Sequence, residues 1–89
     1  MRGFVSSPAY RAVATVLAKV RNDAGVSQRE LAKRVGTLPS VIAKMETGSR
    51  RVDVLELIQI AQALGLRPEE VFNDARRAVS DAEHSREGR

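Results

Sequence analysis

Four glycines divide the sequence into short stretches, and their spacing constrains the fold more than any other feature. In each stretch before a glycine, apolar residues recur at intervals of three and four, as they do on one face of a helix. A glycine commonly follows the last residue of a helix, because it adopts the left-handed backbone conformation without a steric penalty. The chain is therefore expected to be a series of helices that stop at Gly25, Gly36, Gly48 and Gly65.

The expected helix starts carry signals of their own. Ser7 precedes Pro8, and proline suits the first turn because its missing amide hydrogen would have no partner there. Ser27 and Glu30 have the spacing of a capping box, in which each side chain bonds to the other residue's backbone amide. Asp53 is a good cap for a later helix. The predicted helices cover residues 8–24, 28–35, 38–46 and 54–64, and a fifth begins at residue 68.

These elements predict an all-α, compact five-helix domain over residues 8–73. Residues 1–7 are expected to form a flexible arm, and residues 74–89 a helical extension followed by a polar, disordered tail. The core must be aliphatic, because 43% of the residues are hydrophobic while only 3% are aromatic. A chain of 89 residues holds one such domain and no second one.

Several function classes are excluded by what the sequence lacks. It has no cysteine, which removes disulfides and thiolate metal sites. No apolar run approaches the ~20 residues that cross a bilayer, so we expect a cytoplasmic protein with no membrane partner. The single histidine, His84, lies in the polar tail, and no glycine-rich phosphate loop or metal-ligand cluster appears. We therefore expect no enzyme, cofactor, metal or small-molecule ligand.

The stretch from Gln28 to Glu46 is the most informative motif. Two short helices flank Gly36, which can reverse the chain between them. Ala32 is expected where the two helices approach most closely, because a larger side chain would push them apart. The angle between the helices would be filled by Leu31, Val35, Ile42 and Met45. This arrangement is typical of a helix-turn-helix, although a helix pair around a glycine also occurs as plain core architecture.

Charge is distributed unevenly along the chain. Residues 1–51 carry ten basic and three acidic groups, or +7, and residues 52–89 carry five and eight, or −3, which together give the net charge of +4. The first part is therefore where an anion would bind. An ordinary solvated surface remains the alternative from charge alone.

From about Tyr10 to Phe72 the sequence resembles the phage-repressor and Cro-like, or XRE-type, helix-turn-helix family. The resemblance rests on VRNDAGVSQRELAKRVG, SVIAKMETGSRR and DVLELIQIAQALGLRPEEVF. It implies a five-helix fold, sequence-specific binding of double-stranded DNA and regulation of transcription, for example as a repressor. It also implies that helix 28–35 lies on the DNA backbone, helix 38–46 enters the major groove, Gln28 bonds a phosphate, and Arg21 pairs with Glu46.

The start of helix 38–46 departs from the family pattern. Pro39 stands where a polar side chain often contacts a base, and Leu38 stands where a polar cap is commoner, so this edge is apolar and suited to thymine methyl groups. Lys44 can bond either guanine acceptors or a phosphate. The residues expected to contact bases are Leu38, Pro39, Ser40, Ala43 and Lys44.

Basic residues around this helix are expected to bind the DNA backbone. Arg50 and Arg51 directly follow the helix, which favours phosphate contacts. Arg34 is interpreted as part of a solvated helix face. With Gln28, the residues expected to contact phosphates are Arg29, Lys33, Arg50 and Arg51.

A homodimer on a two-fold related operator is expected, because one short helix makes few base contacts. The candidate dimer surface is an apolar stripe that continues the fifth helix, at Val71, Phe72, Ala75 and Val79. Alternatively, Val71 and Phe72 complete the core of the monomer, and the residues after 73 fray. The competing function is that of an antitoxin or a helical protein-interaction adaptor built on the same fold. If the protein binds DNA, we expect it to be associated with the nucleoid.

Overall fold

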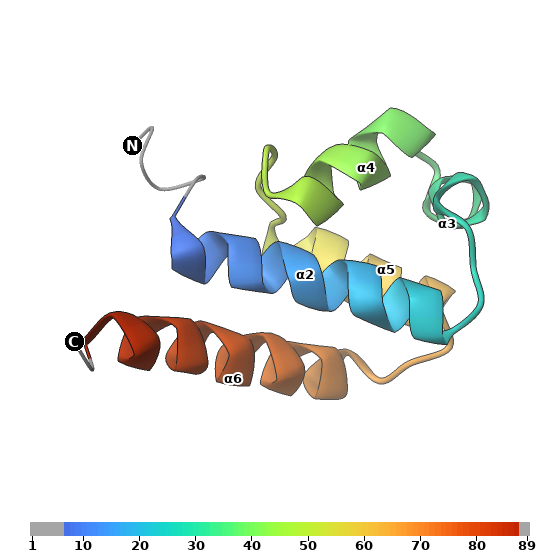
Figure 1. The fold of residues 1–89 in the computed structure, drawn as a ribbon. Helices are drawn as coiled ribbons and strands as arrows, with labels where there is room; N and C mark the ends of the chain where they lie inside the picture. Colours follow the sequence, from blue (N-terminus) through green and yellow to red (C-terminus); the bar gives the residue numbers. More distant parts are fainter. Residues whose placement is uncertain (1–6, 88–89) are drawn as a thin grey trace.

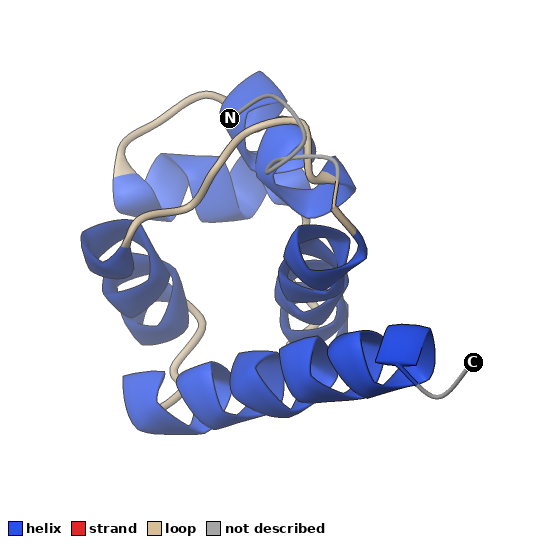
Figure 2. Ribbon diagram, turned by 90° about the vertical axis from the view of Figure 1, so that its left-hand side faces the viewer, coloured by secondary structure: helices blue, strands red, loops and turns tan. Residues whose placement is uncertain are grey.

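The computed structural model describes residues 7–87, so the arm predicted at residues 1–7 lies outside the described residues except for Ser7. Helix and loop account for the whole described range (Figure 2). The five helices are α2 (Pro8–Asp23), α3 (Gln28–Val35), α4 (Pro39–Thr47), α5 (Val54–Ala63) and α6 (Pro68–Glu87). The predicted all-α, five-helix architecture is confirmed.

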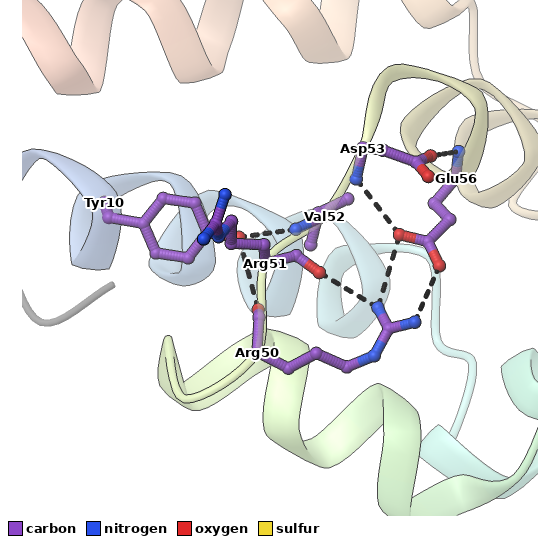
Figure 3. A network of polar contacts seen from close by, with 6 residues as sticks. All are labelled: Tyr10, Arg50, Arg51, Val52, Asp53 and Glu56. Atoms are coloured by element: carbon purple, nitrogen blue, oxygen red, sulfur yellow. Dashed lines mark hydrogen bonds and ion pairs between the residues drawn. The ribbon is translucent and has the colours of Figure 1, made fainter. Parts of the chain in front are cut away.

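The helices begin where their caps are. Ser7 Oγ accepts a hydrogen bond from the Tyr10 amide, and Ser27 Oγ accepts one from the Glu30 amide. The capping box predicted at Ser27 is only half formed, because the Glu30 carboxylate pairs with Arg34 instead. A complete box forms at the start of α5, where Asp53 and Glu56 bond to each other's backbone amides (Figure 3).

The corner between α3 and α4 is built as the sequence predicts. Gly36 has a φ of 81°, and the amides of Gly36 and Thr37 both bond to the Ala32 carbonyl. Ala32 is fully buried at the close approach of the two helices. The core around this corner contains Val26, Leu31, Ala32, Ile42, Met45, Ile60 and Leu64. Val35 packs against its edge.

Gly48 fixes the other end of α4 against α2. It has a φ of 82°, and a Cβ at this position would lie 3.3 Å from Cγ of Arg11 and 3.8 Å from Cβ of Ala14. A side chain here would therefore meet both an unfavourable backbone conformation and a neighbouring helix. The absence of a side chain at Gly48 therefore allows the end of α4 to lie close to α2.

The long helix α6 corrects two expectations about burial, those for the dimer candidates Val71 and Ala75. It lies alongside α2 and runs in the opposite direction (Figure 1). Val71 and Ala75, one turn apart, are buried, whereas Phe72 is 57% exposed because it lies about 100° around the helix from Val71. In the first turn of α5, Val54 is 75% exposed, whereas Ile60 further along this helix is buried in the core.

α6 also extends further than the sequence indicated. It continues through residues 80–87, most of the segment interpreted as a polar, disordered tail. His84 is exposed on this helix, with its Nδ1 3.4 Å from Ser80 Oγ. In the described part of the chain, none of the helices is both long and apolar enough to cross a membrane.

Candidate nucleic-acid interface

The first half of α4 presents an exposed edge. Leu38 precedes the helix without a side-chain cap bond and is 65% exposed, although a leucine is normally buried. Pro39 and Ser40 are exposed beside it. Lys44 is exposed one turn after Ser40, and residues four apart lie on the same helix face. Ala43 is half-buried. Four of the five expected base contacts are thus open to solvent on one short helix.

Basic side chains extend this surface onto α3. Arg29 and Lys33 are exposed and four residues apart, so they share a face of the helix. Arg34 is exposed, in line with its interpretation as part of a solvated helix face, and it also makes two structural bonds. Its Nε lies 3.0 Å from the Glu30 carboxylate, and its Nη1 donates to the Ala63 carbonyl at 2.9 Å. Arg34 therefore attaches α3 to the last turn of α5.

A buried polar cluster connects α2, α3 and α4. Arg21 donates from Nε and Nη2 to the two carboxylate oxygens of Glu46, at 2.6 and 2.9 Å, and from Nη1 to the Val26 carbonyl at 2.8 Å. The side chains of this pair are only 10% and 7% exposed. The hydrogen bonds to Glu46 raise the pKa of Arg21, so the guanidinium is firmly charged. The pair fixes the end of α4 relative to α2.

Gln28 belongs to the same cluster. Its Nε2 donates to Oε1 of Glu46 at 2.9 Å, and the residue is half-buried at the start of α3. This side chain, expected at a phosphate, is therefore oriented by a carboxylate on α4. The bond connects the predicted backbone-contacting helix to the predicted recognition helix.

A second arginine–glutamate pair lies in the connection between α4 and α5 (Figure 3). Arg50 donates from Nη1 and Nη2 to the Glu56 carboxylate, at 3.2 and 2.9 Å, and from Nη1 to the Arg51 carbonyl at 2.9 Å. The Arg50 hydrogen bonds hold the pKa of Glu56 below its usual range, and the same bonds raise the pKa of Arg50. Arg51 is exposed next to it. Arg50, expected at a phosphate, thus has an internal partner.

Tyr10 fastens this connection to α2. Its hydroxyl donates to the Arg50 carbonyl at 3.2 Å and accepts a hydrogen bond from the Val52 amide (Figure 3). Burial raises the pKa of Tyr10, so the hydroxyl keeps its proton. Sequence reasoning missed both Tyr10 and Glu56. The Asp53–Glu56 capping-box spacing could have identified Glu56, whereas the bonds of Tyr10 reach residues 40 and 42 positions away and have no local signal.

The expected site residues separate into two faces. The base candidates and the basic residues of α3 lie on the α3–α4 corner, which projects from the rest of the domain (Figure 1). The dimer candidates lie on α6, and two of them, Val71 and Ala75, are corrected to core residues because they are buried within the monomer. Phe72 is exposed and Val79 is half-buried. No group of three side chains able to hold a metal occurs in the described part of the chain.

A projecting helix after a glycine corner, with basic side chains beside it, defines a class of DNA-binding proteins. The comparisons place the chain in that class. Residues 17–71 match the family model described as helix-turn-helix. The chain belongs to this XRE-type, Cro-like helix-turn-helix family, whose members are DNA-binding regulators of transcription. No curated protein sequence matches the chain.

Three solved structures are similar to this chain along most of its length. The clp gene regulator ClgR from Corynebacterium glutamicum is 25% identical, with a TM-score of 0.78 over 89% of this chain and 84% of that one. An XRE-family like protein from Pseudomonas syringae pv. tomato is 29% identical, with a TM-score of 0.72 over 85% and 93%. The restriction-modification controller protein C.AhdI from Aeromonas hydrophila is 29% identical, with a TM-score of 0.66 over 70% and 90%.

Proposed function

We propose that the protein regulates transcription by inserting α4 into the major groove of its operator while α3 lies across the phosphate backbone. The observation that carries this proposal is the exposed edge from Leu38 to Lys44 on the second helix of a tightly packed corner. Side chains on such an edge reach base pairs, because the major groove accommodates an α-helix. The protein acts by binding DNA rather than by catalysis, in the cytoplasm at the nucleoid.

The contacts divide into two kinds. Ser40 and Lys44 supply polar groups for base edges, and Leu38 supplies an apolar contact for a thymine methyl group. Pro39 and Ala43 complete the base-facing set through van der Waals contact. Phosphates are bound by Gln28, Arg29, Lys33, Arg50 and Arg51.

The first test is selection of duplexes from a random pool, followed by titration of variants on the best site and on single-base substitutions of it. Lys44→Ala and Ser40→Ala should each cost about 1–3 kcal/mol and relax preference at one base pair. Lys33→Ala should weaken all sequences alike and reduce the salt slope by about 0.9. Lys19→Ala is the matched control, because Lys19 is an exposed lysine of α2 paired with Asp23. Selection that yields no preferred sequence would refute the proposal.

We further propose that the regulator binds as a homodimer through an apolar groove between α2, α5 and α6. The groove holds about 400 Å³ and is lined by Val13, Val52, Asp53, Val54, Leu57, Phe72, Arg76 and Val79, together with the buried Ala75. Exposed apolar surface of this kind marks an interface. Asp53 and Arg76 place opposite charges on the same groove, which suits a second copy related by a two-fold axis.

Sedimentation of the free protein and of its operator complex tests the dimer. Phe72→Asp should give a monomer, because it places a charge in the proposed interface while leaving the core intact. Leu55→Asp is the matched control, since Leu55 is 61% exposed on α5 and does not line the groove. Two-fold related half-sites about one helical turn apart should appear among the selected duplexes. A complex of one protein with one duplex would overturn the dimer.

A further inference from the structure

The guanidinium of Arg50 is only partly used by its internal partners. It has five N–H donors in a fixed plane. Glu56 takes one from Nη1 and one from Nη2, and the Arg51 carbonyl takes the second from Nη1. The two remaining hydrogens, on Nε and Nη2, lie side by side on the adjacent edge of the plane. Among the described residues no acceptor bonds to Nε of Arg50, and the side chain is 40% exposed.

Both ends of this side chain are held by the fold. Glu56 is fixed in the first turn of α5, where its Oε1 also accepts the Asp53 amide at 3.0 Å. At the other end, the Arg50 carbonyl accepts a hydrogen bond from the Tyr10 hydroxyl at 3.2 Å. In Figure 1, the connection that carries Arg50 leaves the end of α4 on the same side of α2 as α4 itself. The guanidinium therefore has a set orientation before any ligand arrives.

We propose that Glu56 is a positioning residue for DNA binding, which holds Arg50 so that its Nε–Nη2 edge receives two oxygens of one operator phosphate. A parallel pair of N–H donors matches phosphate geometry, and arginine binds phosphates in this bidentate way. A side chain ordered in advance does not lose rotamer freedom on binding, which improves affinity. This inference rests on the proposed DNA-binding function and adds a specific residue to it.

Simple electrostatics predicts the opposite change in DNA affinity when the charge of Glu56 is removed. A carboxylate next to a phosphate contact repels the DNA, so removing its charge should strengthen binding. It would also release Arg50 from a competing anion. The positioning role predicts weaker binding when the same charge is removed, because the guanidinium is then no longer oriented. The direction of the change therefore distinguishes positioning from competition.

The experiment titrates the full chain with a selected duplex at several salt concentrations. Glu56→Gln keeps the shape of the side chain and the acceptor for the Asp53 amide while removing the charge. It should weaken binding about three- to tenfold, in proportion to the freedom regained by one long side chain. In an Arg50→Ala background the same substitution should no longer weaken binding. Arg50→Lys, which keeps the charge but loses the fork, should also bind less tightly.

Glu30→Gln is the matched control. It removes the same charge from another arginine–glutamate pair, and Arg34 is directed by its second bond to the Ala63 carbonyl of α5. This variant should bind DNA as tightly as the unmodified protein or more tightly. A thermal melt of each variant separates a loss of fold from a loss of orientation. If Glu56→Gln is too unstable, Arg50→Lys carries the test alone, and undiminished affinity in that variant overturns the proposal.

Tighter or equal binding by folded Glu56→Gln would overturn the positioning role while leaving DNA binding in place. A failure of the proposed function looks different, because the unmodified protein would then select no duplex at all. The two failures are therefore distinguishable in the same set of titrations.

Discussion

The two arginine–glutamate pairs at the end of α4 use the same residue types in opposite environments. Arg21 gives its Nε–Nη2 edge to Glu46, and both side chains are at most 10% exposed. Arg50 gives its terminal Nη1–Nη2 edge to Glu56, and these side chains are 40% and 26% exposed. Arg21 thus bonds its glutamate through the Nε–Nη2 edge, which Arg50 leaves available. Burial and the choice of edge thus separate an arginine that holds the fold together from the arginine proposed to bind DNA.

The largest expected effect comes from breaking the buried pair. Arg21→Ala should lower the free energy of unfolding by about 3–5 kcal/mol, because the Glu46 carboxylate would be left buried without its cation. Glu46→Ala should cost a similar amount. Denaturant unfolding of both variants and of the double variant measures the coupling between them. Additive effects would mean that the two residues act independently, contrary to the geometry.

Breaking the exposed pair should change the stability of the fold little and operator binding more. Arg50→Ala should change the free energy of unfolding by less than about 1 kcal/mol, as is usual for a partly exposed ion pair. Its salt slope for operator binding should fall by about 0.9, corresponding to one phosphate contact. Denaturant melts and salt titrations on one preparation give both values. A large loss of stability with an unchanged slope would place Arg50 in the fold and remove the contrast with Arg21.

Sequence reasoning reached the architecture because the signals for it are local. Gly36, Ser27 and the periodic apolar residues act within one or two turns, and the family resemblance implied that Arg21 and Glu46 pair. Burial around α6 was less predictable. Whether Phe72 or Ala75 faces inward depends on the rotation of a whole helix against α2, and both residues fit an apolar stripe in the sequence.

The partners of the charged side chains were the hardest part to predict. A phosphate contact was expected for Arg50 from its place after α4, but its partner Glu56 lies six residues further on, where a capping carboxylate is an adequate explanation by itself. Arg34 is exposed as expected, but its bond to a carbonyl 29 residues away was not foreseen. Such side chains are long and flexible, so their partners depend on the tertiary structure and not on local spacing.

An effect on stability of similar size is expected from releasing the connection that carries Arg50. Tyr10→Phe removes the hydroxyl that joins the Arg50 carbonyl and the Val52 amide to α2. The loss should be about 1 kcal/mol of unfolding free energy, typical of a hydrogen bond in a protein. Operator affinity should fall as well, because Arg50 would be held at one end only. Intact affinity would show that Glu56 is sufficient to orient the guanidinium.

The smallest expected effect is a pH dependence that belongs to the exposed pair. Arg50 lowers the pKa of Glu56 in the folded protein, so the unfolded chain takes up a proton first as the solution is acidified. The stability that Glu56 contributes is therefore complete above its ordinary pKa of about 4.3 and is lost as the pH falls through the lowered value. Unfolding free energies of the unmodified protein and Glu56→Gln, measured across this range, should differ by an amount that shrinks on acidification. Other carboxylates titrate in both proteins and cancel in the difference. A constant difference would mean that the Arg50–Glu56 bond contributes nothing to stability in solution.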